Sequence, residues 1–364
     1  MRVLFINAVC GIGSTGRICV DAAKELEREG HEVRIAYGRG VVPENCKKYA
    51  VRIGGRLDVY WHALMTKYFD QRGLCSKHAT RKFVEWANDY DPDMVWIHNI
   101  HDYTINYEIL FQWIKSRPQM QVKWTQHDCW AFTGGCMYFS RINCYQWKNA
   151  CLKCPIGSRK KSYHIEQKNF TRKQAAFTGV KNMTIVAVSR WIGQLVSESF
   201  LREYPVEISY NQIDGNVFKP TNSNFKEKYS LEEKKIILGV ANIWDSRKGA
   251  DDFIQLSRMI ESNYVIVMVG LHKYNPKKLP SNIIWIDHTN DAKELAEIYT
   301  AADVFLNLTY EDNYPTVNLE SQACGTPCIT YRTGGSPESV PEENVVAQGD
   351  LKRVIERIYE LCEN

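Results

Sequence analysis

The chain has 364 residues, of which 44% are hydrophobic and 24% are charged, and it carries a formal net charge of +4 at pH 7. This length is too great for one ordinary hydrophobic core and predicts two domains of about 150 to 200 residues each. The composition is typical of a globular protein, and so small a net charge gives no support to a nucleic-acid-binding function.

Strand and helix patterns alternate through the first half of the sequence. An apolar run at 3–9 predicts a first strand, followed by a Gly-rich turn and a helix over 18–28. Further buried strands are expected at 33–37, 94–98, 121–125 and 184–188. Short apolar strands separated by helices are typical of parallel sheets built from βαβ units.

The second half repeats this alternation after a polar, proline-bearing segment at 214–235, which is predicted to be a linker. Strands are expected at 235–240, 265–269, 283–286, 304–308 and 328–331, and helices near 249–261, 291–301, 316–324 and 350–362. We therefore predict an α/β protein with an N-terminal domain over 1–213 and a C-terminal domain over 214–364. Each would be an open, doubly wound parallel sheet, with ligands at the carboxyl ends of the strands and hence in a cleft between the domains.

The most informative stretch runs over 311–338 and reads EDNYPTVNLESQACGTPCITYRTGGSPE. Acidic residues, a helix, a short apolar strand and a Gly-Gly-x-Pro-Glu turn follow one another within it. A helix N-terminus beside a strand end suits an anionic phosphate, and carboxylates suit hydroxyl groups. Phosphate and polyol binding together indicate a nucleotide-sugar ligand.

Arg247 and Lys248 follow the strand at 235–240 and precede a helix. Two adjacent cations beside a helix N-terminus suit a pyrophosphate and would stabilise a departing nucleoside diphosphate. A solvated helix start is the alternative for this segment taken alone.

The Gly-rich loop after the first strand contains Gly13 and Gly16, which would let the backbone approach a ligand closely. The glycine spacing is similar to that of dinucleotide-binding loops. However, the strand at 33–37 ends in Tyr-Gly-Arg, without an acidic residue to hold a ribose. A plain tight turn is therefore the alternative.

His127 follows the strand at 121–125 and precedes Asp128. A histidine at a strand end would hydrogen-bond a sugar hydroxyl or polarise a reacting group. A purely structural role is equally compatible with the sequence.

Five of the twelve cysteines lie between 129 and 154. Four of them end in a Cys-x2-Cys pair and fit a tetrahedral structural zinc site within a Cys-rich insertion at about 129–155. The spacing of the first three is not that of a standard zinc finger, so reduced thiols and disulfides are alternatives. The four predicted zinc ligands are Cys136, Cys144, Cys151 and Cys154.

Together these segments resemble the retaining glycosyltransferases of family 4, which have the GT-B fold of two facing Rossmann-like domains. The resemblance covers most of the chain, and its motifs are highly specific in combination. Taken singly, only the last of them is strong. The motifs are the Gly-rich loop, Tyr210-Asn211-Gln-Ile213-Asp214, Lys248-Gly249 and the acidic stretch that ends in Gly334-Gly335-x-Pro337-Glu338.

The resemblance implies transfer of a sugar from a nucleotide-sugar held by the C-terminal domain to an acceptor on the N-terminal domain. Lys248 would contact the donor pyrophosphate, Glu320 the ribose hydroxyls, and His127 the transferred sugar. Asn318 and Leu319, which precede Glu320, are placed with it among the donor-binding residues. The leaving phosphate would deprotonate the acceptor. Lys248 and helix dipoles would stabilise the departing diphosphate, so that catalysis would require no metal or other cofactor.

The sequence departs from the family pattern at two places. The two acids of the family lie one residue closer together than Glu311 and Glu320, so Asp312, which has the family spacing, is an equal candidate for the sugar-contacting acid. Asn242 stands where the family carries a phosphate-binding arginine, and Arg247 is predicted to supply the missing charge.

We therefore expect a hexosyl- or N-acetylhexosaminyltransferase of bacterial surface-polysaccharide assembly. It would use a UDP- or GDP-type donor and a glycan or lipid-linked acceptor, and it would not bind nucleic acid. The alternatives are a nucleotide-sugar epimerase of the same architecture and a non-catalytic module that binds a nucleotide-sugar or a glycan.

The apolar N-terminal segment predicts a buried strand and not a signal peptide, and no apolar run reaches the roughly 18 residues of a spanning helix. These features predict a cytoplasmic location. Aromatic and basic side chains near 61–72 are typical of an ordinary amphipathic helix packed on its domain. A peripheral contact with the inner face of the plasma membrane is the alternative hypothesis for the same residues. The residues concerned are Trp61, His62, Lys67, Tyr68, Phe69 and Arg72.

Overall fold

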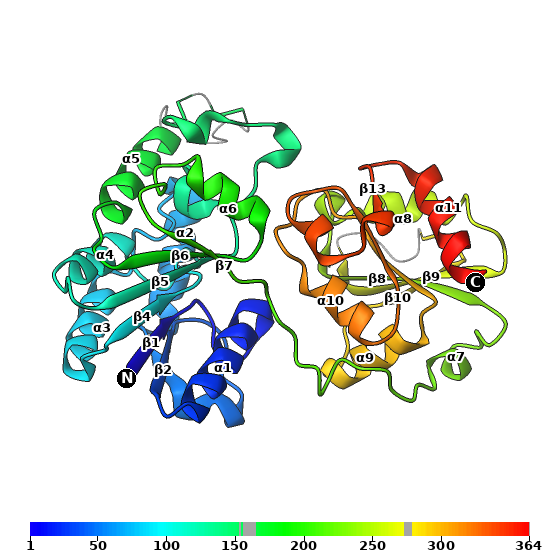
Figure 1. The fold of residues 1–364 in the computed structure, drawn as a ribbon, viewed down its shortest axis with the longest axis horizontal. Helices are drawn as coiled ribbons and strands as arrows, with labels where there is room; N and C mark the ends of the chain where they lie inside the picture. The colour runs from blue at the N-terminus through cyan, green and yellow to red at the C-terminus, as the bar shows by residue number, and fades with distance from the viewer. Residues whose placement is uncertain (153, 156–164, 273–278, 364) are drawn as a thin grey trace. The chain divides into compact units, whose positions relative to one another are not determined.

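The computed structural model describes residues 1–152, 154–155, 165–272 and 279–363. The chain divides into two compact units, Met1–Tyr210 (unit 1) and Asn211–Asn364 (unit 2), shown in Figure 1. This division falls slightly before the predicted boundary between 213 and 214. Each unit contains a parallel sheet with a hydrophobic core on both faces, which confirms the α/β class.

Unit 1 has a seven-stranded parallel sheet in the order β3-β2-β1-β4-β5-β6-β7. Its strands are β1 (Arg2–Ile6), β2 (Glu32–Tyr37), β3 (Ala50–Arg52), β4 (Met94–Ile97), β5 (Gln121–Gln126), β6 (Met183–Ala187) and β7 (Val206–Ile208). Its α-helices are α1 (Gly13–Arg28), α2 (Arg56–Phe69), α3 (Lys77–Tyr90), α4 (Tyr107–Lys115), α5 (Ile165–Phe177) and α6 (Arg190–Ser197).

Unit 2 has a six-stranded parallel sheet in the order β10-β9-β8-β11-β12-β13. Its strands are β8 (Lys235–Trp244), β9 (Tyr264–His272), β10 (Ile283–Ile286), β11 (Val304–Asn307), β12 (Cys328–Tyr331) and β13 (Val345–Val346). Its α-helices are α7 (Phe225–Lys228), α8 (Ala250–Leu256), α9 (Ala292–Ala301), α10 (Thr316–Ala323) and α11 (Leu351–Cys362).

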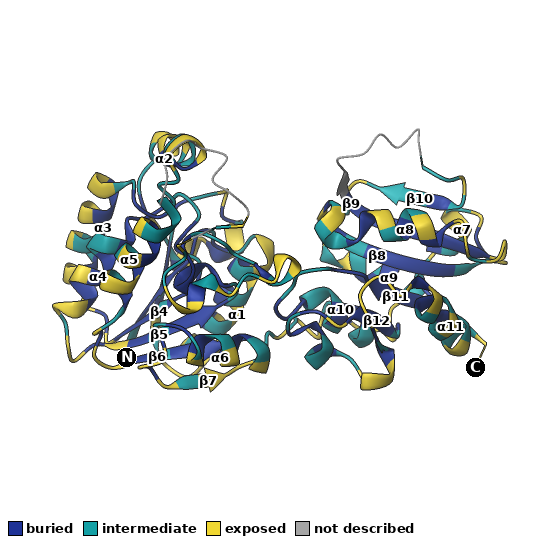
Figure 2. Ribbon diagram, turned by 90° about the horizontal axis from the view of Figure 1, so that it is seen from above, coloured by how far each residue is buried: buried dark blue, intermediate teal, exposed yellow. Residues whose placement is uncertain are grey.

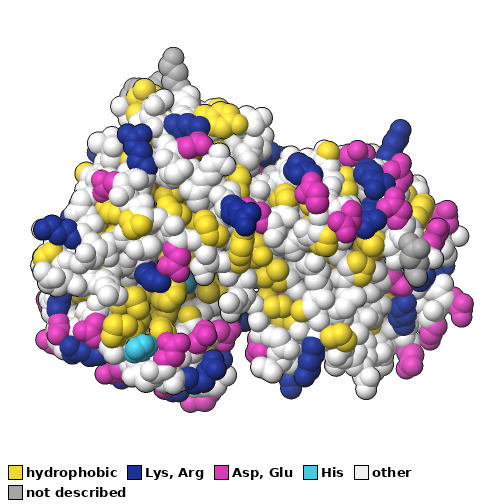
Figure 3. All heavy atoms as spheres, viewed as in Figure 1, with side chains coloured by type: hydrophobic (Ala, Val, Ile, Leu, Met, Phe, Trp, Pro, Cys, Tyr) yellow, Lys and Arg dark blue, Asp and Glu magenta, His cyan; other side chains and the backbone are white. Residues whose placement is uncertain are grey.

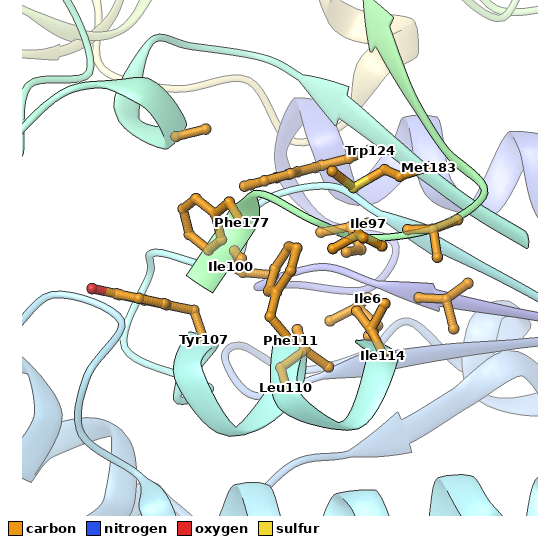
Figure 4. Packing of buried hydrophobic residues seen from close by; sticks show 14 of the residues in the cluster. Ile6, Ile97, Ile100, Tyr107, Leu110, Phe111, Ile114, Trp124, Phe177 and Met183 are labelled. Atoms are coloured by element: carbon orange, nitrogen blue, oxygen red, sulfur yellow. The ribbon is translucent and has the colours of Figure 1, made fainter. Parts of the chain in front are cut away.

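The central strands are apolar on both faces because helices cover both, and Figure 2 shows them largely buried. The edge strands β3, β7 and β10 are more exposed. In β1, Leu4 packs in one core layer and its neighbour Phe5 packs in the other. The first layer is rich in aromatic rings. The ring centroid of Phe177 in α5 lies 4.6 Å from that of Phe111 in α4 and 4.8 Å from that of Trp124 in β5 (Figure 4). This packing fixes the strands whose carboxyl ends carry the predicted site.

The strand order reverses once in each sheet. In unit 1 the first strand, β1, lies between β2 and β4, and in unit 2 the first strand, β8, lies between β9 and β11. Helices must cross to opposite faces on the two sides of such a strand, which leaves a crevice at its carboxyl end. The loops after β1 and β4, and those after β8 and β11, are therefore the places to look for ligands.

Two predictions about local structure are wrong. The first helix begins at Gly13 and not near 18, so part of the Gly-rich loop is helical. The segment at 214–235 is not a loose linker, because Phe218, Phe225 and Leu231 are buried in the core of unit 2 beside α9. The segment packs on unit 2 through these few apolar side chains, although most of its residues are polar.

The distribution of charged side chains on the described surface is consistent with the small net charge of the chain. On the face shown in Figure 3, Lys and Arg side chains alternate with Asp and Glu side chains over both units. No described helix has the length and apolar character needed to span a membrane.

Candidate functional site

The clearest cluster of charged groups in unit 2 lies at the point where its strand order reverses. Lys248 follows β8, and its ammonium group lies 2.5 Å from the Asp312 carboxylate in the loop after β11. Both side chains are mostly buried, with 21% and 14% of their areas exposed. A partly desolvated ion pair at such a point is suited to charge stabilisation, because its surroundings screen it less than water would.

The backbone around Lys248 holds this cation close to β11. The Asp245 carboxylate accepts a hydrogen bond from the backbone N–H of Lys248 at 3.1 Å and so caps a single 3₁₀ turn. Gly249 then adopts a left-handed conformation with φ of 73°, and a Cβ atom there would lie 2.2 Å from the carbonyl oxygen of Leu308. Only glycine fits this position, since any side chain would push the two loops apart.

Arg247 and Asn242 have different surroundings. Asn242 stands where the family carries a phosphate-binding arginine, and Arg247 was predicted to supply the missing charge. The guanidinium of Arg247 donates a hydrogen bond to the carbonyl oxygen of Glu311 at 3.0 Å. Its own carbonyl oxygen accepts from the backbone N–H of Tyr310 at 2.8 Å. Arg247 thus binds the loop that carries both candidate acids, whereas Asn242 is exposed in β8 beside a register shift in its pairing with β9.

The helix α10 carries two buried polar residues that were predicted to bind the donor, Glu320 and Asn318. The carboxylate of Glu320 accepts a hydrogen bond from the Tyr299 hydroxyl at 3.2 Å, and the residue is only 4% exposed. Leu319 beside it is partly exposed. The ribose-binding role of Glu320 stays a prediction.

Asn318 has a structural environment. Its amide nitrogen donates to the hydroxyls of Ser336 at 3.3 Å and Ser339 at 2.9 Å, and its amide oxygen accepts from Asn307 at 2.8 Å. The side chain is fully buried and joins α10 to β11 and to the turn after Gly334-Gly335. The Asn318 amide therefore positions the turn from within the core of unit 2, and its predicted contact with the donor stays a prediction.

In unit 1 the Gly-rich loop packs tightly against the start of α1. A Cβ atom on Gly16 would lie 3.0 Å from the Val9 side chain, so Gly16 serves close packing of the helix, while Gly13 is exposed. The amide of Asn7 donates to the carbonyl oxygen of Val9 at 2.8 Å and accepts from the backbone N–H of Asn99 at 3.1 Å. Asn7 therefore joins the loops after β1 and β4.

His127 lies at the carboxyl end of β5 and contacts a second histidine. Its Nε2 atom is 2.9 Å from Nδ1 of His98, which follows β4, and the two rings stack with centroids 5.1 Å apart. Next to this pair, Nε2 of His101 lies 3.3 Å from the Asp128 carboxylate. The Asp128 carboxylate also accepts from the backbone N–H of Trp130 at 2.8 Å. The loops after β4 and β5 thus form one polar network.

The hydrogen-bond pattern assigns the protons of the two histidines. Nε2 of His98 is buried and contacts no polar partner among the described residues. A proton on that atom would be a buried, unpaired donor, whereas a proton on Nδ1 is donated to His127. His127 therefore accepts at Nε2 and carries its own proton on Nδ1. Burial lowers the pKa of His127 to about 4, so it is neutral at physiological pH.

Another buried histidine, His62 in α2, is a structural group and so is not available for the membrane contact that was the alternative for this segment. Its Nε2 atom accepts from the backbone N–H of Gly73 at 3.0 Å, and Nδ1 lies 2.9 Å from the Ser76 hydroxyl. Burial lowers its pKa to about 4. Protonation at Nε2 would break the bond to Gly73 and leave a buried charge.

Unit 1 is expected to lose stability as the pH falls from about 6.5 towards 4. The unfolded chain binds a proton at His62 with a pKa near 6.5, whereas the native state binds it only near 4. The cost between pH 6.5 and 5 is about 2 kcal/mol for this residue. Urea unfolding at pH 7 and pH 5 measures the loss. His62→Gln should reduce the dependence by the share of His62 and leave the part due to the buried His98 and His127. His78→Asn, which removes an exposed histidine, should not reduce it.

The segment after His127 is held by a buried lysine. The ammonium of Lys173 in α5 donates to the carbonyl oxygens of Trp130 at 2.7 Å and Thr133 at 3.0 Å and lies 3.7 Å from the Trp130 ring centroid. Burial lowers its pKa to about 7. The start of the Cys-rich insertion is therefore part of the unit 1 core.

The four predicted zinc ligands influence one another. Burial raises the pKa of the Cys136 thiol to about 12, and the nearby Cys154, Cys151 and Cys144 add to the effect. No disulfide forms in the part of the chain that the structure describes. Within that part, no group of three or more His, Cys, Asp or Glu side chains is arranged to hold a metal ion. The zinc site stays a prediction from the sequence.

Residues 221–364 match the family model described as "Glycosyl transferases group 1". The chain carries a glycosyltransferase group 1 domain. This domain holds Arg247, Lys248, Asp312 and Glu320, whereas Gly13, Gly16 and His127 belong to unit 1. The domain assignment agrees with the family resemblance that the motifs indicated.

The curated relatives that the chain matches are distant. The N-acetyl-alpha-D-glucosaminyl L-malate synthase of Bacillus anthracis is 26% identical over 44% of this chain and 45% of the relative. The putative colanic acid biosynthesis glycosyl transferase WcaC of Escherichia coli is 23% identical over 97% of this chain and 90% of the relative. The chain spans about half the length of several curated relatives it matches, 45%, 52% and 51% for three of them.

Solved structures show the same fold. A sucrose-phosphate synthase from Thermosynechococcus elongatus superposes with a TM-score of 0.71 at 14% identity, covering 100% of this chain and 90% of that one. HepE from Anabaena, solved in complex with UDP and glucose, gives a TM-score of 0.68 at 13% identity with the same coverages. The two parallel-sheet, Rossmann-like units therefore have the GT-B fold.

Sequence reasoning missed several residues of the unit 1 network. Asn7, His98 and His101 had no assigned role, although His98 directly follows a strand, as His127 does. That shared position was an available signal. It became informative only once β4 and β5 were known to be neighbours.

Proposed function

We propose that this protein is a retaining glycosyltransferase that moves a hexose or N-acetylhexosamine from a nucleotide-sugar to a glycan or lipid-linked acceptor. The reaction would serve the assembly of a bacterial surface polysaccharide. The similarity to WcaC over 97% of the chain supports this setting. The UDP complex of HepE supports a UDP-type donor.

The Lys248–Asp312 pair is the observation that carries the proposal. It lies at the carboxyl ends of β8 and β11, within the glycosyltransferase group 1 domain. A donor diphosphate placed there would draw the ammonium from Asp312 and leave the carboxylate beside the sugar that the diphosphate carries. Lys248 and Arg247 would then stabilise the charge that develops on the leaving group.

A nucleotide-sugar that binds the native state should raise the melting temperature of the protein. At a ligand concentration 100 times its Kd, the expected stabilisation is about 2.7 kcal/mol. A thermal-shift screen of UDP-, GDP- and ADP-sugars measures this effect and identifies the nucleobase. The absence of a shift with every donor at millimolar concentration would contradict the proposal.

Product analysis separates the proposed function from its alternatives. A transferase forms a new glycosidic bond only when an acceptor is present, whereas an epimerase releases an isomerised nucleotide-sugar without one. A binding module would change neither compound. The anomeric configuration of the product, determined by NMR, tests retention.

We propose in addition that α2 contacts an anionic membrane surface. Five large apolar residues of this helix are between 54% and 83% exposed, and Figure 2 shows how open the helix is. Most of them recur at helical spacing along one face, and Lys67 lies among them. Aromatic rings beside a basic group are typical of helices that lie in the membrane interface. The five residues are Leu57, Tyr60, Trp61, Tyr68 and Phe69.

Replacing Trp61 and Phe69 together with serine is expected to weaken binding to anionic vesicles by about tenfold or more, because each ring loses its buried area in the bilayer interface. Sedimentation with phosphatidylcholine vesicles, with and without phosphatidylglycerol, measures the partition coefficient. Tyr145→Ser removes an aromatic ring of 59% exposure elsewhere in unit 1 and should have no effect. If the wild-type protein does not bind vesicles that contain phosphatidylglycerol, this contact is excluded.

A further inference from the structure

Two arginine side chains from different loops lie against the ring of Tyr103. The guanidinium carbon of Arg39 is 5.8 Å from the ring centroid, and that of Arg72 is 5.6 Å from it. Arg39 follows β2, Arg72 lies between α2 and α3, and Tyr103 lies in the loop after β4. Segments far apart in the sequence thus bring two positive charges to one aromatic ring.

The hydrogen-bonding capacity of these arginines is unused. Each guanidinium has five N–H donors, yet neither donates to any residue within the described part of the chain. Arg39 has an acidic neighbour, Asp102, but the two groups are 3.8 Å apart, which is too far for a hydrogen bond. Arg72 has no ion pair with a described residue. Such a pair of cations attracts an anion.

The surrounding framework holds both arginines in place. The buried His62 accepts from the backbone N–H of Gly73, next to Arg72, and its ring lies 5.9 Å from that of Tyr103. On the other side, a Cβ atom on Gly38, next to Arg39, would lie 2.5 Å from the Thr104 side chain. The two loops therefore pack directly on the loop that carries Tyr103.

Tyr103 itself has the backbone signature of a functional position. Its φ of 65° is in the left-handed region, which a bulky residue adopts only when its surroundings impose it. The same loop contains His101, whose contact with Asp128 reaches the residue next to His127. The loop that carries Tyr103 therefore also contacts, through His101 and Asp128, the segment that carries His127.

We propose that Arg39, Arg72 and Tyr103 form a subsite for a phosphate group of the acceptor. The assignment of this ligand to the acceptor rests on the proposed function and on the family resemblance, which implies an acceptor on the N-terminal domain. Two planar guanidinium groups can each bind two phosphate oxygens. The two forks together offer donors to the several oxygens of a phosphate group, whereas a carboxylate has only two oxygens to meet them.

The test measures binding of inorganic phosphate to the full-length chain by isothermal titration calorimetry. UDP is present in excess, so that phosphate does not report on the pyrophosphate site near Lys248. Arg39→Gln and Arg72→Gln are each expected to weaken phosphate binding by about tenfold, because each removes one charge-assisted fork. Arg202→Gln, which removes an exposed arginine elsewhere in unit 1, should leave the affinity unchanged.

Competition experiments identify the anion. Glycerol 3-phosphate should displace phosphate, whereas glucuronate should do so poorly and glucose not at all. Unchanged phosphate affinity in both glutamine variants, or tighter binding of glucuronate than of glycerol 3-phosphate, would overturn the proposal. If a glutamine variant fails to fold, Arg72→Lys decides, since it keeps the charge but loses the fork and should weaken binding by about threefold.

The outcome for the proposed function is separate. Failure of UDP or any nucleotide-sugar to bind the wild-type chain would count against the glycosyltransferase proposal. Loss of phosphate binding in the arginine variants, with binding kept in Lys248→Ala, would still establish the subsite.

Discussion

Replacing Lys248 with alanine is expected to lower kcat for sugar transfer by about 10²- to 10³-fold. The ammonium lies 2.5 Å from Asp312 at the carboxyl end of β8, where a departing diphosphate would gather negative charge. Its loss removes the stabilisation of that charge and leaves Asp312 unpaired, so that the carboxylate would also repel the donor. The donor KM should therefore rise as well. Initial rates of nucleoside diphosphate release with saturating acceptor measure both effects.

A lysine at the other end of the same strand provides the control. Lys235 begins β8 and pairs with Asp303 at 3.2 Å, and Lys226 contacts the same carboxylate at 3.1 Å. Lys235→Ala leaves that second partner and should change kcat by less than about twofold. Normal turnover in a folded Lys248→Ala protein would remove the lysine from the mechanism. Loss of turnover would instead exclude a non-catalytic binding module.

Asp312→Asn is expected to lower kcat by about 10²-fold, whereas Glu311→Gln should have a much smaller effect. Asp312 is the acid beside the Lys248 ammonium, and the transferred sugar is attached to the phosphate that this lysine would hold. Glu311 is anchored differently, because its backbone carbonyl accepts from Arg247. Steady-state kinetics of the two variants with the same donor compare them directly.

The affinity for UDP gives an independent measure of the same pair. Without the charged carboxylate, Lys248 no longer has a competing anion, so Asp312→Asn should bind UDP more tightly while it transfers sugar more slowly. A variant that loses UDP affinity and kcat together would indicate that Asp312 only orients the lysine. A larger kcat loss in Glu311→Gln would assign the sugar contact to Glu311.

The sequence predicted the elements of this fold best where apolar runs are short and bounded by turn residues. The strands at 283–286 and 328–331 lie where they were expected, as β10 and β12. The start of α1 was missed because Gly13 and Gly16 lie in its first turn and glycine has a low helix propensity. The burial of Phe218, Phe225 and Leu231 was missed because a pattern of isolated apolar residues has no period.

The charged site of unit 2 was predictable because Lys248 and Asp312 follow recognisable strands. The His98–His127 contact was not, since it depends on β4 and β5 being neighbours in the sheet. The surroundings of His62 and Arg72 could not be predicted from the sequence for the same reason, since they depend on which segments pack against α2. A helical pattern gives the faces of α2, but it does not say which face another loop covers.

The close approach of Gly249 to Leu308 also constrains how this protein can change. Because a Cβ atom on Gly249 would lie only 2.2 Å from the Leu308 carbonyl oxygen, the loops after β8 and β11 fit each other as a matched set. A new donor preference acquired by exchanging one loop with a relative would disturb the position of the other. We expect chimeras that exchange both loops together to fold and bind a donor, and those that exchange either one alone to fail. The loops after β8 and β11 are therefore expected to change together in evolution.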